Sequence, residues 1–112
     1  MSLLNILSSP DAWTKHASAR NAEDVIVQLD NPNAVKFCLT GALRHYQRDF
    51  DIKTNLWDNI KGIILNRFPE RLDAFAGELE SAITDFNDHP DTTFEEVVSV
   101  VQEAEALIFR RS

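Results

Sequence analysis

The chain has 112 residues and a mass of 12.7 kDa, which is the size of one ordinary domain. Hydrophobic residues make up 44% and charged residues 26%, so the chain is expected to fold rather than to stay disordered. The net charge of −7 disfavours nucleic-acid binding, the single cysteine excludes an internal disulfide, and no apolar run approaches the about 18 residues that span a membrane.

The first third of the chain predicts short elements. Residues 1–7 are apolar enough for about one and a half helical turns. Ser9, Pro10 and Asp11 then form a helix start, with Ser9 as the N-cap and Pro10 as the first helical residue. Residues 25–29 are the one strand-like segment, and because a lone strand has no partner we expect it to lie extended on helices.

A central helix is predicted over residues 33–47, after Pro32. One face of it carries small and apolar residues at helical spacing: Ala34, Phe37, Cys38, Gly41, Ala42 and His45. A glycine inside a helix costs about 1 kcal/mol relative to alanine. Gly41 therefore predicts that another backbone segment approaches closely at this point.

Three further helices follow. Apolar periodicity predicts helices over residues 55–67 and 69–84, the second opened by Pro69. The last helix is predicted to begin with a capping box in which Thr92 caps and Glu95 reaches back. The predicted fold is a single all-α domain, residues 1–112, with compact orthogonal or bundle-like packing of four main helices plus one or two short N-terminal helices.

Two stretches go beyond generic helix patterning: Ala34-Val-Lys-Phe-Cys-Leu-Thr-Gly-Ala-Leu43 and Phe86-Asn-Asp-His-Pro-Asp-Thr-Thr-Phe-Glu-Glu-Val97. Together they resemble an uncharacterised family of small bacterial and phage proteins, a domain of unknown function. That family carries a Cys-Leu-x-Gly-Ala-Leu helix and an Asn-Asp motif before a Thr-x-Glu-Glu-Val helix start. The resemblance spans residues 3–108 and implies a fold but no reaction.

Polar side chains in these two stretches are the candidate site residues: Cys38, His45, Asn87, Asp88 and His89. The structural interpretation is a buried inert thiol and a turn between helices, in which Asn and Asp bond nearby backbone N–H groups. Cys38 and His45 lie on one helix face but about 10.5 Å apart along the axis, too far for a direct hydrogen bond. The histidines show no metal-binding spacing.

The leading functional hypothesis is a small cytoplasmic, non-enzymatic module that binds a protein partner or itself, as in a homodimer. It needs no cofactor, no metal, no nucleic acid and no membrane. The contact surface would be formed by apolar residues that fall off the main helical stripes: Trp13, Phe50, Ile52, Leu65 and Phe109. The alternative is a ligand-binding or enzymatic pocket between the helix of residues 33–47 and the loop of residues 87–91.

Overall fold

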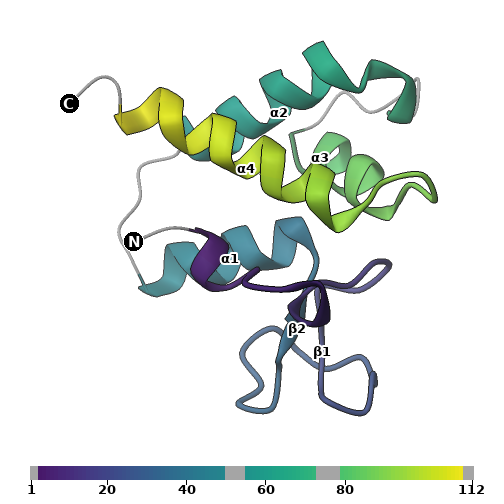
Figure 1. The fold of residues 1–112 in the computed structure, drawn as a ribbon. Coiled ribbons are helices and arrows are strands. Elements are labelled where there is room, and N and C mark those ends of the chain that lie inside the picture. Colours follow the sequence, from purple (N-terminus) through teal and green to yellow (C-terminus); the bar gives the residue numbers. More distant parts are fainter. Residues whose placement is uncertain (1–2, 50–54, 73–78, 110–112) are drawn as a thin grey trace. The chain divides into compact units, whose positions relative to one another are not determined.

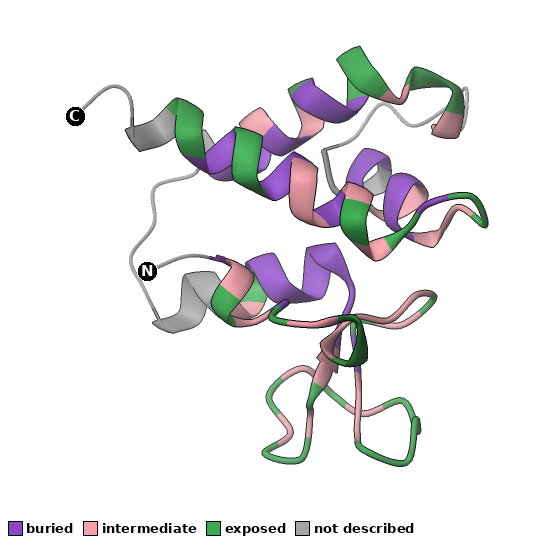
Figure 2. Ribbon diagram, viewed as in Figure 1, coloured by how far each residue is buried: buried purple, intermediate pink, exposed green. Residues whose placement is uncertain are grey.

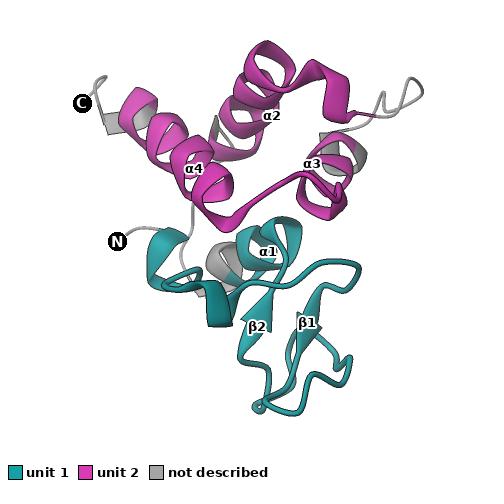
Figure 3. Ribbon diagram, turned by 45° about the vertical axis from the view of Figure 1, so that its right-hand side comes forward, with its two compact units in different colours: residues 1–52 teal, residues 53–112 magenta. Residues whose placement is uncertain are grey.

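The computed structural model describes residues 3–49, 55–72 and 79–109 (Figure 1). By contacts the chain divides into two compact units, Met1–Ile52 and Lys53–Ser112, and each is described by itself (Figure 3). The first unit contains the 3₁₀ helices η1 (Leu3–Asn5) and η2 (Pro10–Ala12), the strands β1 (Ala19–Arg20) and β2 (Lys36–Phe37), and helix α1 (Leu39–Asp49). The second contains α2 (Asn55–Arg67), the 3₁₀ helix η3 (Pro69–Arg71), α3 (Leu79–Asp88) and α4 (Phe94–Phe109). The prediction of one domain over residues 1–112 stays a prediction.

The first unit contains a small antiparallel sheet, so the all-α prediction is wrong and the protein is mixed α/β. Strand β1 pairs with β2, with Ala19 opposite Phe37 and Arg20 opposite Lys36. Isolated bridges extend the pairing on both sides, from Arg20 to Ile26 and from Phe37 to Trp13. The order across the sheet is therefore the segment around Ile26, then β1, then β2, then Trp13.

Helix α1 begins at Leu39, six residues later than the predicted start at residue 33. The residues before Leu39 pair through their backbone with residues 18–20 instead. The Val35 N–H donates to the Arg20 carbonyl, and the Cys38 N–H donates to the Ser18 carbonyl. The Cys38 sulfur then accepts a hydrogen bond from the Gly41 N–H at 3.2 Å, which caps the first turn. The face predicted from Ala34 to His45 therefore belongs partly to a strand and partly to a helix.

Gly41 is where the loop before β1 touches α1. A side-chain carbon built on Gly41 would collide with the carbonyl oxygen of Ser18 and would lie 3.0 Å from its carbonyl carbon. The predicted close approach of a backbone segment at this glycine is confirmed. The core of this unit is formed by buried apolar residues (Figure 2): Leu3, Leu7, Ala19, Phe37, Leu39, Ala42 and Leu43.

In the second unit α2 packs against both α3 and α4. Asn59 donates to the Ala104 carbonyl and Arg67 donates to Ser99 and Glu103, so α2 and α4 run antiparallel (Figure 1). The bounds of α2 match the predicted helix over residues 55–67. The predicted helix over 69–84 is wrong in its bounds, because η3 ends at Arg71 and α3 extends from Leu79 to Asp88. Residues 73–78 lie outside the described residues.

Helix α4 has a capping box one residue later than predicted. The Thr93 hydroxyl accepts from the Glu96 N–H at 3.2 Å, and the Glu96 carboxylate accepts from the Thr93 N–H at 2.9 Å. Thr92, the predicted cap, is buried and accepts a hydrogen bond from Arg71. The same arginine donates to Glu96 at 2.6 Å, which ties the end of η3 to the start of α4.

Candidate functional site

Two of the predicted site residues lie in the first unit. Cys38 is buried, and its sulfur caps the first turn of α1. The ring of His45 packs against Phe37, with 5.1 Å between ring centroids. The His45 ring therefore packs α1 against β2, whereas the Cys38 sulfur bonds within the first turn of α1.

The other three predicted site residues lie in the second unit: Asn87 and Asp88 are the last two residues of α3, and His89 follows directly. Asn87 is fully buried, and its amide donates to the Asp88 carboxylate at 3.0 Å. The His89 ring accepts from the Asp91 N–H at 3.1 Å, and the Thr92 N–H donates to the His89 carbonyl. The turn between the two helices therefore begins at His89, whereas Asn87 and Asp88, which were predicted as turn residues, end α3.

The five predicted residues are thus divided between the two units, and the pocket predicted between residues 33–47 and 87–91 stays a prediction. Within the described parts of the chain, no group of three or more His, Cys, Asp or Glu side chains is placed to hold a metal ion. None of the described helices is long and apolar enough to cross a membrane.

The first unit presents a different candidate, the hairpin segment, which we define as residues 19–37. The Asn21 N–H donates to the Val25 carbonyl and the Asp24 N–H to the Asn21 carbonyl, each at 3.0 Å, so a three-residue loop joins β1 to the next segment. Asp24 has a φ of 67°, the left-handed conformation that such a loop requires at its last position. The Asn21 side chain accepts from the N–H groups of Glu23 and Val25 and fixes the turn.

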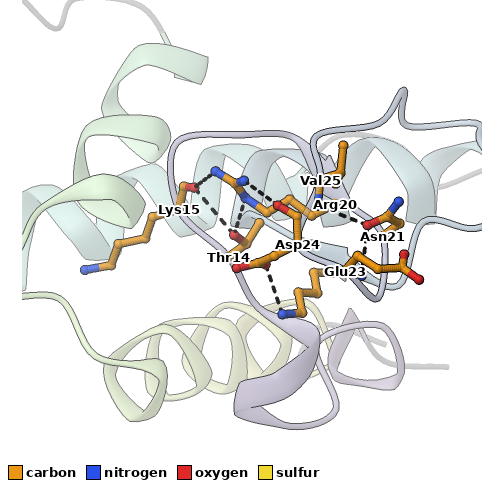
Figure 4. A network of polar contacts seen from close by, with 8 residues as sticks. Thr14, Lys15, Arg20, Asn21, Glu23, Asp24 and Val25 are labelled. Carbon is orange, nitrogen blue, oxygen red and sulfur yellow. Dashed lines mark hydrogen bonds and ion pairs between the residues drawn. The ribbon is translucent and has the colours of Figure 1, made fainter.

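Charged side chains connect the turn of residues 21–24 with neighbouring parts of the first unit (Figure 4). The Arg20 guanidinium donates to the Thr14 hydroxyl at 3.0 Å and to the Asp24 carbonyl at 2.9 Å. Lys36 pairs with the Asp24 carboxylate at 3.0 Å, and this hydrogen bond holds the pKa of Asp24 below its ordinary value. Figure 4 shows the Glu23 side chain pointing away from this network.

Three large apolar side chains of the hairpin segment are exposed to solvent and not buried in a core. Val25 is 56% exposed, Ile26 62% and Val35 48%. An open hollow of about 400 Å³ adjoins Val35 and is lined by apolar and polar residues: Ser9, Asp11, Ala12, Ala22, Val35 and Lys36. Figure 2 shows the loops of the hairpin segment mostly exposed, in contrast to the buried start of α1.

Sequence reasoning placed the contact surface elsewhere. Leu65 is 46% exposed and Trp13 is half-buried, its ring contacted by the Lys15 ammonium. Phe50 and Ile52 lie outside the described residues, as does the side chain of Phe109. The signal that was available is the β-branched run of residues 25–27 after an Asn-Ala-Glu-Asp turn sequence.

The Asn21 side chain is expected to be worth about 1 kcal/mol of stability, because Asn21→Ala removes two hydrogen bonds from the turn. The measurement is urea unfolding together with hydrogen exchange at the Val25 amide. Asn33→Ala is the matched control, since Asn33 uses its backbone N–H in the next turn and keeps it. Equal stability of the two variants would contradict this assignment.

Fold and site together define a small mixed α/β protein whose first unit carries an exposed apolar hairpin. A family model described as Family of unknown function (DUF6197) matches residues 4–107, and the chain belongs to this family. The resemblance drawn from the sequence is thereby confirmed, while the motif details and the bacterial or phage origin stay predictions. No curated protein and no solved structure matches the chain.

Proposed function

We propose that this protein acts by binding a protein chain, either a partner or a second copy, through the hairpin segment of its first unit. The observation that carries the proposal is the exposure of Val25, Ile26 and Val35 within one hairpin. Single exposed apolar residues are common, but three between residues 25 and 35, on segments that flank β1, favour an interaction surface.

The hollow beside Val35 supports the same proposal. Its mixture of apolar and polar lining residues suits the side chain of a bound segment. Cytoplasmic location and binding without catalysis are further parts of this proposal.

The test is chemical crosslinking and affinity purification from the cells that naturally produce the protein, with three forms of the chain. These are the natural sequence, Ile26→Asn in the hairpin segment, and Leu65→Asn as the matched control on the second unit. Both replaced residues are exposed, so circular dichroism should show that both variants fold.

We expect Ile26→Asn to reduce recovery of the bound chain by about tenfold, because a central apolar contact is worth more than about 1 kcal/mol. Leu65→Asn should leave recovery unchanged. Undiminished recovery with Ile26→Asn, or loss with Leu65→Asn alone, would show that binding uses another surface.

A further inference from the structure

The guanidinium group of Arg20 is held in place by neutral oxygen atoms. Its Nε–H donates to the Thr14 hydroxyl at 3.0 Å, Nη1 donates to the Asp24 carbonyl at 2.9 Å, and Nη2 donates to the Lys15 carbonyl at 3.4 Å (Figure 4). None of these acceptors is charged, and within the described parts of the chain no carboxylate forms an ion pair with Arg20. The side chain is therefore fixed in position while its charge has no direct counter-ion.

Two arginines of the second unit show the more usual arrangement. Arg67 pairs with Glu103 at 3.3 Å, and Arg71 pairs with Glu96 at 2.6 Å. Ordering a long charged side chain costs conformational entropy, which charge-assisted bonds to a carboxylate normally offset. At Arg20 three bonds to neutral oxygens offset this cost instead, and the capacity of the guanidinium to bind an anion stays unused.

The donors that remain on Arg20 suit a ligand with two oxygen atoms. A guanidinium has five N–H groups, one on Nε and two on each Nη. Because each nitrogen of Arg20 makes one bond, one N–H remains on Nη1 and one on Nη2. Such a pair of donors binds both oxygens of a carboxylate or a phosphate. Arg20 is half-buried, so a ligand can reach these donors from solvent.

The charges around Arg20 leave a local positive surplus. Lys36 lies opposite Arg20 in the sheet and pairs with the Asp24 carboxylate at 3.0 Å. The pKa of Asp24 is lowered chiefly by this hydrogen bond and by the charge of Lys36, and the charge of Arg20 is the smallest of the causes. Two cations therefore face one carboxylate, and the Glu23 side chain points away from them (Figure 4).

This surplus favours a carboxylate over a phosphate. A carboxylate carries one negative charge, which matches the local surplus, whereas a phosphate group carries about 1.5–2 at pH 7. The excess charge of a phosphate would be repelled by Asp24 and by a chain whose net charge is −7. Salt screens exposed charges beyond about 10 Å, so a single carboxylate at Arg20 responds mainly to the cations beside it.

Arg20 also lies beside one of the exposed apolar side chains. Ile26 and Arg20 are opposite each other in an antiparallel bridge, so their side chains lie on one face of the sheet with Cβ atoms about 4.5–5.5 Å apart. Neighbouring residues alternate between the faces, and the face of Ala19 and Phe37 is buried. A chain that contacts Ile26 therefore passes within reach of the Arg20 guanidinium.

We infer that Arg20 is the binding site for one carboxylate group of the chain that binds at the hairpin segment. The inference rests on the proposed function and adds the chemistry of the partner. The partner places an apolar side chain against Ile26 and a carboxylate on Arg20. That carboxylate belongs either to an Asp or Glu side chain or to the C-terminus of the partner. Because bidentate bonds are directional, they also orient the bound chain.

The first experiment follows the side-chain Nε–H signal of Arg20 by NMR in the natural chain. Sodium acetate, sodium phosphate and sodium chloride are added in parallel at equal ionic strength. We expect a saturable shift with acetate, of the millimolar affinity of a single partly exposed ion pair, and none with chloride. Arg67 is the internal control, because its guanidinium already pairs with Glu103 and its signal should move much less.

The second experiment compares three peptides: acetyl-Leu-Glu-Leu-amide, acetyl-Leu-Gln-Leu-amide, and acetyl-Leu-Leu with a free C-terminal carboxylate. We expect the Glu peptide or the free-carboxylate peptide to bind about fivefold more tightly than the Gln peptide. The tighter of the two identifies the source of the carboxylate. Arg20→Lys keeps the charge but lacks the paired donors, so this preference should vanish, whereas Arg67→Lys should retain it.

An Arg20 signal that ignores acetate, or that responds as strongly to chloride or more strongly to phosphate, overturns the inference, and this result needs no variant that folds. Equal affinity for all three peptides overturns it as well. If the inference fails but Ile26→Asn still loses a partner from cells, the proposed function stands. If Arg20 binds acetate but Ile26→Asn loses nothing, the carboxylate site stands and the proposed function fails.

Discussion

Replacing Gly41 with alanine is expected to destabilise the protein by about 3 kcal/mol, at the upper end of what one added methyl group does in a packed interior. The added carbon would collide with the carbonyl of Ser18, and its nearest neighbours are all backbone atoms of that residue. Backbone atoms cannot rotate aside as a side chain does. Relief requires the loop to move, which also breaks the bond from the Cys38 N–H to the Ser18 carbonyl.

Gly62 provides the matched control for this experiment. It lies inside α2 with no atom within 4 Å of an added side-chain carbon. Gly62→Ala should therefore stabilise the protein by about 0.5–1 kcal/mol, because alanine favours a helix and restricts the unfolded chain. Urea unfolding of both variants measures the difference, and a Gly41→Ala variant as stable as the natural chain would refute the contact.

The second large effect is expected at Glu96, whose replacement by alanine should cost about 2 kcal/mol. Its carboxylate accepts from the Thr93 N–H at 2.9 Å and from Arg71 at 2.6 Å, so one substitution removes a helix cap and an ion pair. The Arg71 side chain is only 14% exposed and would lose its carboxylate partner.

Glu95 is the control that separates the two possible capping boxes. It is exposed, and it is the residue that the sequence alone assigned to the cap. Glu95→Ala should change the free energy of unfolding by less than about 0.5 kcal/mol. Thermal unfolding of the two variants shows which of the two capping boxes forms. A larger loss of stability with Glu95→Ala than with Glu96→Ala would contradict the observed cap.

The contribution of Glu96 should also depend on pH. The hydrogen bond from Arg71 is the main cause that holds the pKa of Glu96 below its ordinary value of 4.5, with the Thr93 N–H adding to it. A carboxyl group with a lowered folded pKa stabilises fully above its unfolded pKa and loses that stabilisation as pH falls through the folded value. The difference in unfolding free energy between the natural chain and Glu96→Gln should therefore shrink from about pH 6 to about pH 3.

How far the sequence predicted the fold depends on the range of the interactions involved. The helix over residues 55–67 was predicted with its observed bounds, because Trp57, Ile60 and Ile64 repeat at local spacing. A helix start at Pro10 was also predicted, and a 3₁₀ helix does begin there, but it ends at Ala12 and Ser9 makes no side-chain cap bond to it. A turn before the last helix was predicted as well, but Asn87 and Asp88, which were assigned to it, are the last residues of α3.

The sheet escaped prediction because its strands are only two residues long and its pairs join distant segments. Ala19 and Arg20 carry no strand signal, and Phe37 fits the apolar spacing of the predicted helix over residues 33–47. The candidate site escaped for the same reason. Residues 25–29 were recognised as strand-like. Periodicity does not reveal that Ile26 pairs with Arg20, nor that its side chain stays exposed.

The sequence by itself therefore determined the elements held by contacts between residues a turn apart, the absence of an internal disulfide, and the family. Only the tertiary structure decided where α1 begins, which threonine caps α4, and which apolar residues stay outside the core. Helical periodicity is set by neighbours three or four residues apart, whereas strand pairing and burial depend on segments that meet only when the whole chain has folded.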